Sequence, residues 1–150
     1  MNNHCISQLK PISRAFYKLV EIINTMDLLE NYKYKNMKTF HLAEGPGGFI
    51  EAFSYLRNNK DDIYYGTTLI DKTDKSIPYW KKSSIVSDTN IIIENGCDNT
   101  GNLYNKDNFL YFNDKYYDQF DFVTADGGID FSADFDKQEI MAIKLIFCEI

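Results

Sequence analysis

The stretch Phe40-His41-Leu42-Ala43-Glu44-Gly45-Pro46-Gly47-Gly48-Phe49 decides the fold of this chain. A short apolar run leads into a turn rich in glycine and proline, and apolar residues then recur at helical spacing, at Phe49, Ala52, Phe53 and Leu56. This order predicts a strand, a tight loop and a helix, the first unit of an α/β nucleotide-type site. Glycines let a bound group approach the backbone, and the helix N-terminus is expected to offer unpaired amide donors. The loop therefore suits a carboxylate or a phosphate, and a simple strand-to-helix turn is the alternative interpretation.

Hydrophobic patterning divides the rest of the chain into alternating helices and strands. The predicted helices are Ser13–Leu29, Phe49 to about Asn58, a segment containing Phe109, Phe112 and Tyr116, and Gln138–Ile150. The predicted strands are Thr39–Ala43, Ile63–Leu69, Asn90–Glu94 and Asp121–Ala125, of which the third, with three consecutive isoleucines, is expected to be buried. Right-handed crossovers between such strands give a parallel sheet. The pattern therefore predicts an α/β domain.

Two carboxylates follow predicted strands directly. Asp71 lies just past the second strand, where a carboxylate is well placed for ribose hydroxyls, and Asp126 follows the fourth strand beside Gly127 and Gly128. The carboxyl ends of central strands carry active sites in this architecture. Each aspartate has an ordinary alternative as a loop residue that accepts backbone N–H groups. Trp80 is open to two interpretations as well, stacking on a base or capping the core.

The last predicted helix, Gln138–Ile150, is apolar almost all round, so it is expected to be buried on most faces. A sheet that ends after its fourth strand would expose an unpaired edge and a flank of this helix. We therefore expect that more sequence, or a protein partner, covers this side of the domain.

Composition limits the class of protein. A chain of 150 residues with 44% hydrophobic residues is expected to form one domain, residues 1–150, that is soluble and intracellular, cytoplasmic or nuclear, with no membrane segment. The cysteines at 5, 97 and 148 and the histidines at 4 and 41 form no ligand cluster, so no metal site is expected. The net charge of -6 argues against non-specific binding to nucleic acid.

Four motifs together resemble one family. The stretches Gly45-Pro46-Gly47-Gly48-Phe49 and Thr124-Ala125-Asp126-Gly127-Gly128 each follow a predicted strand. The stretches Ser13-Arg14-Ala15-Phe16-Tyr17-Lys18-Leu19 and Gln138-Glu139-Ile140 complete the set in the family's order. Each motif is weak alone, but the ordered set resembles the FtsJ-like RNA ribose 2′-O-methyltransferases. Within them it looks most like the enzymes that methylate the first transcribed nucleotide of capped mRNA, including those of large DNA viruses.

The resemblance implies a Rossmann-like, doubly wound methyltransferase domain that binds S-adenosylmethionine and acts on RNA. Lys18 and Asp126 match the first lysine and the aspartate of the family's Lys-Asp-Lys-Glu catalytic set. The second lysine and the glutamate would follow Ile150, so little turnover is expected from these 150 residues alone.

The resemblance also implies a cofactor site. The loop Glu44-Gly45-Pro46-Gly47-Gly48-Phe49 would receive the methionine part of the cofactor. Asp71, Asp98 and Asn102 fall near the family's adenosine-binding stretches. Asn102 stands where the family pattern has an aspartate, and His41 where the first strand often carries one.

Other classes fit less well. A dinucleotide-dependent oxidoreductase would need a third glycine where Ile50 stands, and a P-loop would need a Gly-Lys-Ser/Thr sequence. The ribosomal-RNA branch of the same family usually carries a Ser-Asp-Met-x-Pro turn, which differs from Ala125-Asp126-Gly127-Gly128. A truncated, non-catalytic methyltransferase-like module that binds cofactor, RNA or a partner subunit stays open as the alternative.

Overall fold

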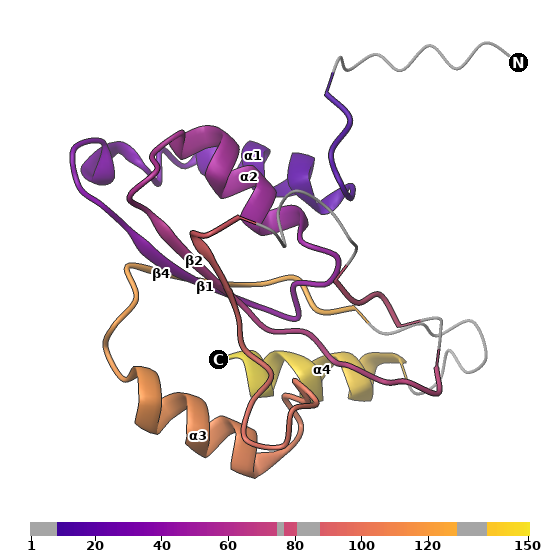
Figure 1. Ribbon diagram of the computed structural model, residues 1–150. Helices are drawn as coiled ribbons and strands as arrows, with labels where there is room; N and C mark the ends of the chain where they lie inside the picture. The colour runs from indigo at the N-terminus through magenta and orange to yellow at the C-terminus, as the bar shows by residue number, and fades with distance from the viewer. Residues whose placement is uncertain (1–8, 75–76, 81–87, 129–137) are drawn as a thin grey trace, which may run out of the picture.

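The computed structural model describes residues 9–74, 77–80, 88–128 and 138–150, and its centre is a parallel sheet with helices on both faces (Figure 1). The strands are β1 (Lys38–Leu42), β2 (Ile63–Gly66), β3 (Ile91–Ile93) and β4 (Phe122–Ala125), in the order β3-β2-β1-β4. Helices α1 (Ala15–Thr25) and α2 (Gly48–Arg57) cover one face, and α3 (Lys106–Tyr116) and α4 (Gln138–Glu149) lie on the other (Figure 1). The predicted doubly wound α/β architecture is confirmed.

The side chains of β1 point alternately to the two faces of the sheet, and each face carries its own hydrophobic cluster. His41 points toward α2, where its ring lies 5.2 Å from that of Phe53. Phe40 points to the other face and meets Phe112 of α3 at a centroid distance of 5.5 Å. Because successive strand residues face opposite sides, one buried strand organises both layers.

The predicted element boundaries were too long at several ends, and backbone conformation explains most of the differences. Helix α1 stops at Thr25, because Asp27 has a left-handed φ of 51°, and a short 3-10 helix, η1 (Glu30–Tyr32), follows. Strand β1 stops before Ala43, whose φ is 52°. These conformations end regular structure because their φ values lie outside the helical and extended regions.

Two elements are less buried than the sequence predicted. Strand β3 is an edge strand, and its three isoleucines are only half-buried. Helix α4 was expected to be buried on most faces, but several of its apolar side chains are exposed. These are Ile140, Ile143, Ile146 and Phe147, with exposed fractions of 58%, 59%, 54% and 82%. The prediction was wrong here: Leu145 and Glu149 lie against the turn after β4, while these four side chains stay exposed.

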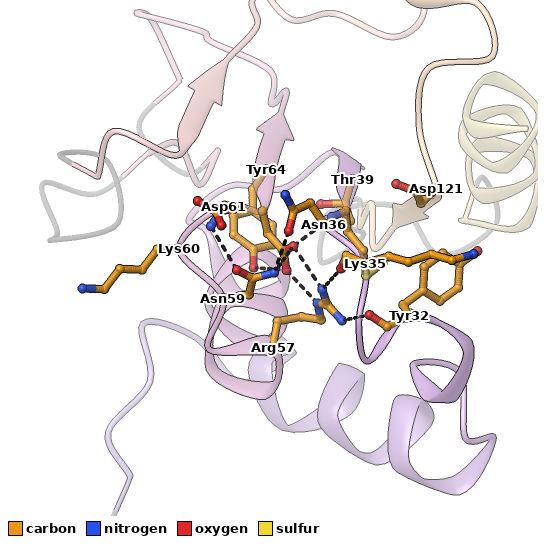
Figure 2. A network of polar contacts seen from close by, with 12 residues as sticks. Tyr32, Lys35, Asn36, Thr39, Arg57, Asn59, Lys60, Asp61, Tyr64 and Asp121 are labelled. Atoms are coloured by element: carbon orange, nitrogen blue, oxygen red, sulfur yellow. Dashed lines mark hydrogen bonds and ion pairs between the residues drawn. The ribbon is translucent and has the colours of Figure 1, made fainter.

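A buried ion pair fixes the end of the sheet where the strands begin. Arg57, at the end of α2, donates through Nε to Asp62 Oδ2 at 2.6 Å. Its other nitrogens donate to the carbonyl oxygens of Tyr32 and Lys35, and Figure 2 shows the guanidinium directed into that segment. Asp62 also accepts from the Met37 amide at 2.8 Å. This network connects the end of α2 to η1 and to the start of β1, and so fixes the position of α2 on the sheet.

Candidate active site

The loops that follow β1, β2 and β3 meet at one edge of the sheet. The Glu44 amide donates to the Thr67 carbonyl at 2.9 Å, which joins the first loop to the second. The Ile70 amide donates to the Thr100 carbonyl at 2.7 Å, which joins the second to the third. This edge is where α/β domains bind their ligands.

Glycines in the first loop make room for the protein's own chain. A Cβ on Gly45 would lie 2.4 Å from the Pro78 carbonyl oxygen, so the segment after β2 packs directly on the loop. A Cβ on Gly48 would lie 2.1 Å from Ser13 Oγ, at the entry to α1. Gly47 has a φ of 117°, a conformation that side chains disfavour. The loop is therefore a tightly packed turn that draws α1 and the Pro78 segment together.

Glu44 caps the helix that the glycine loop begins. Its Oε1 accepts hydrogen bonds from the amides of Phe49 and Ile50, at 2.8 and 2.9 Å. The expected unpaired amide donors at this helix N-terminus are therefore partly used by the protein itself. Glu44 is 5% exposed. Burial raises the pKa of its carboxyl, and the charge of Asp126 raises it as well, while the two hydrogen bonds lower it. The resulting pKa is about 8.

Lys18 and Asp126 meet beside this loop. Helix α1 carries Lys18, whose Nζ donates to Asp126 Oδ1 and forms an ion pair with it. Asp126 directly follows β4, and its side chain is 27% exposed while that of Lys18 is 55% exposed. From helical spacing alone, the side of α1 that carries Lys18 looked like an ordinary solvent-exposed face. The structure instead directs this side chain to the carboxyl edge of the sheet.

Glu149 is a neighbour of this pair that sequence reasoning did not single out. Its Oε1 lies 2.2 Å from where a Cβ of Gly127 would stand. That oxygen is buried and makes no hydrogen bond within the described residues. Burial raises the pKa of Glu149, and the charge of Asp126 adds to this. The signal in the sequence was the small residue at 127, which allows α4 to approach the turn after β4.

Asp71, Asp98 and Asn102 lie in the two neighbouring loops, and each organises its own backbone. Asp71 accepts from the amide and hydroxyl of Thr73, which lowers the pKa of Asp71. The carboxylate of Asp98 accepts from Thr100, Asn105 and Asn108, and these bonds lower its pKa. The Asn102 side chain accepts from the Tyr104 amide at 2.9 Å.

His41 and Trp80 both pack in the hydrophobic core, next to the carboxyl ends of the strands. The ring nitrogens of His41 bond to the hydroxyls of Thr39 and Thr124, each at 2.7 Å, so this histidine links β1 to β4. Burial lowers the pKa of His41 to about 3. Trp80 packs on the cluster beneath α1 and α2, with a ring atom 2.6 Å from where a Cβ of Gly66 would stand. This packing agrees with the interpretation of Trp80 as a residue that caps the core.

Metal and membrane sites were searched among the described residues. That part of the chain holds no group of three or more histidine, cysteine, aspartate or glutamate residues able to bind a metal ion. Cys97 and Cys148 are free thiols, while the cysteine at 5 and the histidine at 4 lie outside the described residues. No described helix has both the length and the hydropathy needed to cross a bilayer.

Comparison with known proteins decides the family. A family model of FtsJ-like methyltransferases matches residues 11–150, which include α1, the glycine loop and the turn after β4. The chain belongs to the FtsJ-like methyltransferase family. The parallel sheet with helices on both faces is the Rossmann-like fold expected of an FtsJ-like domain.

Curated FtsJ-like relatives share this region at modest identity. The chain is 30% identical over 159 aligned positions to cap-specific mRNA (nucleoside-2′-O-)-methyltransferase 2 of Drosophila melanogaster, covering 93% of this chain and 21% of the relative. It is 27% identical over 151 positions to the Danio rerio protein of the same name, covering 91% and 20%. It is 29% identical over 164 positions to cap-specific mRNA (nucleoside-2′-O-)-methyltransferase 1 of Dictyostelium discoideum, covering 93% and 21%. The chain thus spans about a fifth of the length of these relatives.

Proposed function

We propose that this FtsJ-like domain takes part in S-adenosylmethionine-dependent methylation of a ribose 2′-hydroxyl of RNA, at the capped 5′ end of mRNA. The observation that carries the proposal is the ion pair between Lys18 and Asp126 at the carboxyl edge of the sheet. Methyl transfer requires the acceptor oxygen to be held in line with the methyl group. A lysine held by a carboxylate at the edge of a ligand site can orient such a hydroxyl.

The donor set at this edge is compatible with the charge of the cofactor. S-adenosylmethionine supplies an electrophilic methyl group on a positively charged sulfur. Asp126 lies close enough to Glu44 for its charge to raise the pKa of Glu44, and two carboxyl groups suit a cationic ligand better than a phosphate. The glycine loop would hold the methionine part, while the loops with Asp71, Asp98 and Asn102 would border the adenosine.

The chain's own residues have distinct roles in this proposal. Asp126 orients the Lys18 ammonium, and the ammonium would stabilise the negative charge that develops on the ribose oxygen as its proton passes to solvent and the methyl group passes to it from sulfur. Glu44 keeps the glycine loop closed on α2 through the amides of Phe49 and Ile50. The names of the curated relatives, which are cap-specific mRNA methyltransferases, support capped mRNA as the substrate.

The test is single-turnover methyl transfer from labelled S-adenosylmethionine, with a chain extended to include the second lysine and the glutamate of the family pattern, in excess over a short capped RNA. We expect label on RNA whose first nucleotide has a free 2′-hydroxyl, and none on RNA already methylated at that oxygen. The Asp126→Asn variant should lose the transfer while retaining the cofactor. Label on a base, or equal labelling of both RNAs, would contradict the proposal.

One observation favours a second candidate, a truncated, non-catalytic methyltransferase-like module that binds cofactor, RNA or a partner subunit. Strand β4 is an edge of the described sheet, and Val123 on it is 55% exposed. Next to it, the apolar side chains of α4 are exposed, with Phe147 at 82%. An open strand edge beside an apolar helix face is a surface that proteins normally cover.

Sedimentation velocity distinguishes the two candidates on this surface. If the face of α4 is covered by association, the wild-type chain should sediment faster as its concentration rises, and Phe147→Lys should remove that dependence. A monomer at all concentrations that still transfers methyl groups would contradict the module. A protein that binds cofactor, associates through α4 and never transfers a methyl group would support it.

A further inference from the structure

Glu44 is a buried carboxyl group that forms no ion pair with any described residue. It is 5% exposed, and Oε1 is satisfied by two neutral backbone amides. Among the residues the structure describes, the four ion pairs involve Lys18, Lys33, Arg57 and Lys115 with carboxylates other than Glu44. A carboxylate removed from water without a nearby cation is unfavourable, so the charged form of Glu44 lacks compensation.

The charges around Glu44 make this imbalance larger. Asp126, after β4, adds a negative charge, which the ammonium of Lys18 on α1 offsets. On α4, Glu149 is a further carboxyl, and burial and the charge of Asp126 raise its pKa. On α2, Glu51 accepts a hydrogen bond from the Ile12 amide and is not among the charges that act on Glu44. The groups near this end of the glycine loop therefore total more negative than positive charges when all are ionised.

We propose that Glu44 favours the positively charged methyl donor over its neutral thioether product, by releasing a proton when the donor binds. The inference rests on the proposed function, since it places a sulfonium ligand at the glycine loop. A cation supplies the compensation that the protein lacks, so the ionised form of Glu44 becomes favourable only with the donor present. The product has no charge on sulfur and gives no such compensation. After transfer, Glu44 would take up its proton again, and the product would be held less tightly.

Binding of the donor is linked to release of the Glu44 proton, so the affinity for the donor changes with pH. Burial raises the pKa of Glu44 to about 8, so at pH 7 most of the free protein carries this proton. A bound cation lowers that pKa, and donor binding then releases up to ~1 proton per site. The affinity for the donor should rise by up to ~10-fold per pH unit below pH 8 and level off above it. Donor and product carry the same amino-acid end, whose titration cancels when their affinities are compared.

The experiment is isothermal titration of the chain with S-adenosylmethionine and with S-adenosylhomocysteine. Titrations in two buffers of different ionisation enthalpy give the number of protons exchanged, and the series runs from pH 6.5 to 8.5. Glu44→Gln keeps an oxygen that can accept from Phe49 and Ile50 but cannot titrate. Glu51→Gln is the matched control, because Glu51 is a carboxyl seven positions after Glu44, in the first turn of α2, that the inference does not involve. Circular dichroism melts establish that both variants fold.

We expect the wild type and Glu51→Gln to release more protons with the donor than with the product. Their preference for the donor should grow by up to ~10-fold from pH 6.5 to 7.5. In Glu44→Gln, both the extra proton release and the growing preference should vanish. Equal proton exchange for both ligands in the wild type would overturn the inference while leaving the proposed function intact, and that result needs no variant. Failure of both ligands to bind would overturn the proposed function and the inference with it.

Discussion

Lys18 Nζ and Asp126 Oδ1 form an ion pair although 108 positions separate the two residues in sequence. Their contact requires that α1 packs on the sheet with its Lys18 side turned to the carboxyl edge. The packing of Phe16, Leu19 and Ile23 against α2 and the sheet provides that orientation. One relationship therefore joins the first helix to the end of the fourth strand, at the place where the glycine loop lies.

Replacing either partner of this pair should affect chemistry far more than stability. In a chain extended to include the second lysine and the glutamate of the family pattern, we expect Lys18→Met and Asp126→Asn to lower single-turnover methyl transfer by ~10²-fold or more, as for loss of a positioned catalytic group. The unfolding free energy should change by only ~0–1 kcal/mol, because both side chains are partly exposed. Labelled transfer and urea unfolding measure the two effects. A variant that retains full transfer would exclude its residue from the reaction.

The buried pair of Arg57 and Asp62 should behave in the opposite way. Their side chains are 5% and 0% exposed, so Asp62→Asn leaves a guanidinium buried without its counter-charge. We expect a loss of ~3–5 kcal/mol in urea unfolding. The exposed pair of Glu30 and Lys33 is the matched control, and Glu30→Gln should change stability little. Equal effects of the two substitutions would show that burial does not decide the strength of these pairs.

Two glycines near the site should differ sharply in their tolerance of a methyl group. Gly45→Ala would place its Cβ 2.4 Å from the Pro78 carbonyl oxygen, so backbone must move. Among the described residues, no heavy atom lies within 4 Å of that position on Gly128, so Gly128→Ala serves as the control. We expect Gly45→Ala to cost ~1–3 kcal/mol of unfolding free energy and to weaken binding of S-adenosylhomocysteine. Unchanged binding in Gly45→Ala would contradict the assignment of this loop to the cofactor.

How much of this arrangement could be predicted depended on whether it is local. The strand, glycine loop and helix around residues 40–57 follow from neighbouring residues, because turn chemistry and helical spacing act over a few positions. The position of Asp126 at a strand end was predictable for the same reason. The pairing of Lys18 was not, because it depends on how α1 packs across the sheet.

Side-chain roles were harder to predict than positions. The sequence places Glu44 at the glycine loop, but its bonds to Phe49 and Ile50 depend on the exact turn. Asp98 stays a predicted neighbour of the adenosine, and the sequence did not reveal that its carboxylate accepts bonds from Thr100, Asn105 and Asn108. The composition of α4 predicted burial because apolar patterning does not reveal which neighbours are present.

Buried His41 should make the domain sensitive to acid. Its pKa falls from 6.5 to about 3 on folding, because burial disfavours the charged ring. The unfolded chain therefore binds a proton that the folded protein does not, and stability is lost as the pH falls from about 6.5 toward 3. The contribution of this group is at most ~1.4 kcal/mol per pH unit.

The measurement is urea unfolding of the wild type and His41→Asn between pH 4 and pH 7. The wild-type advantage should shrink as the pH falls, since the variant has no ring to protonate. If the unfolding free energies of the two proteins change in parallel over this pH range, His41 does not control the loss of stability in acid.

The measurement that tests the central claim most directly is the thermal unfolding of this chain with S-adenosylhomocysteine, with NAD as the comparison ligand. A ligand at 100 times its Kd adds ~2.7 kcal/mol of stability, which moves the Tm of a small domain by several degrees. We predict that S-adenosylhomocysteine raises the Tm in this way and that NAD does not. A cooperative transition that is raised by NAD, or by neither ligand, would contradict the assignment of this edge of the sheet as a methyl-donor site.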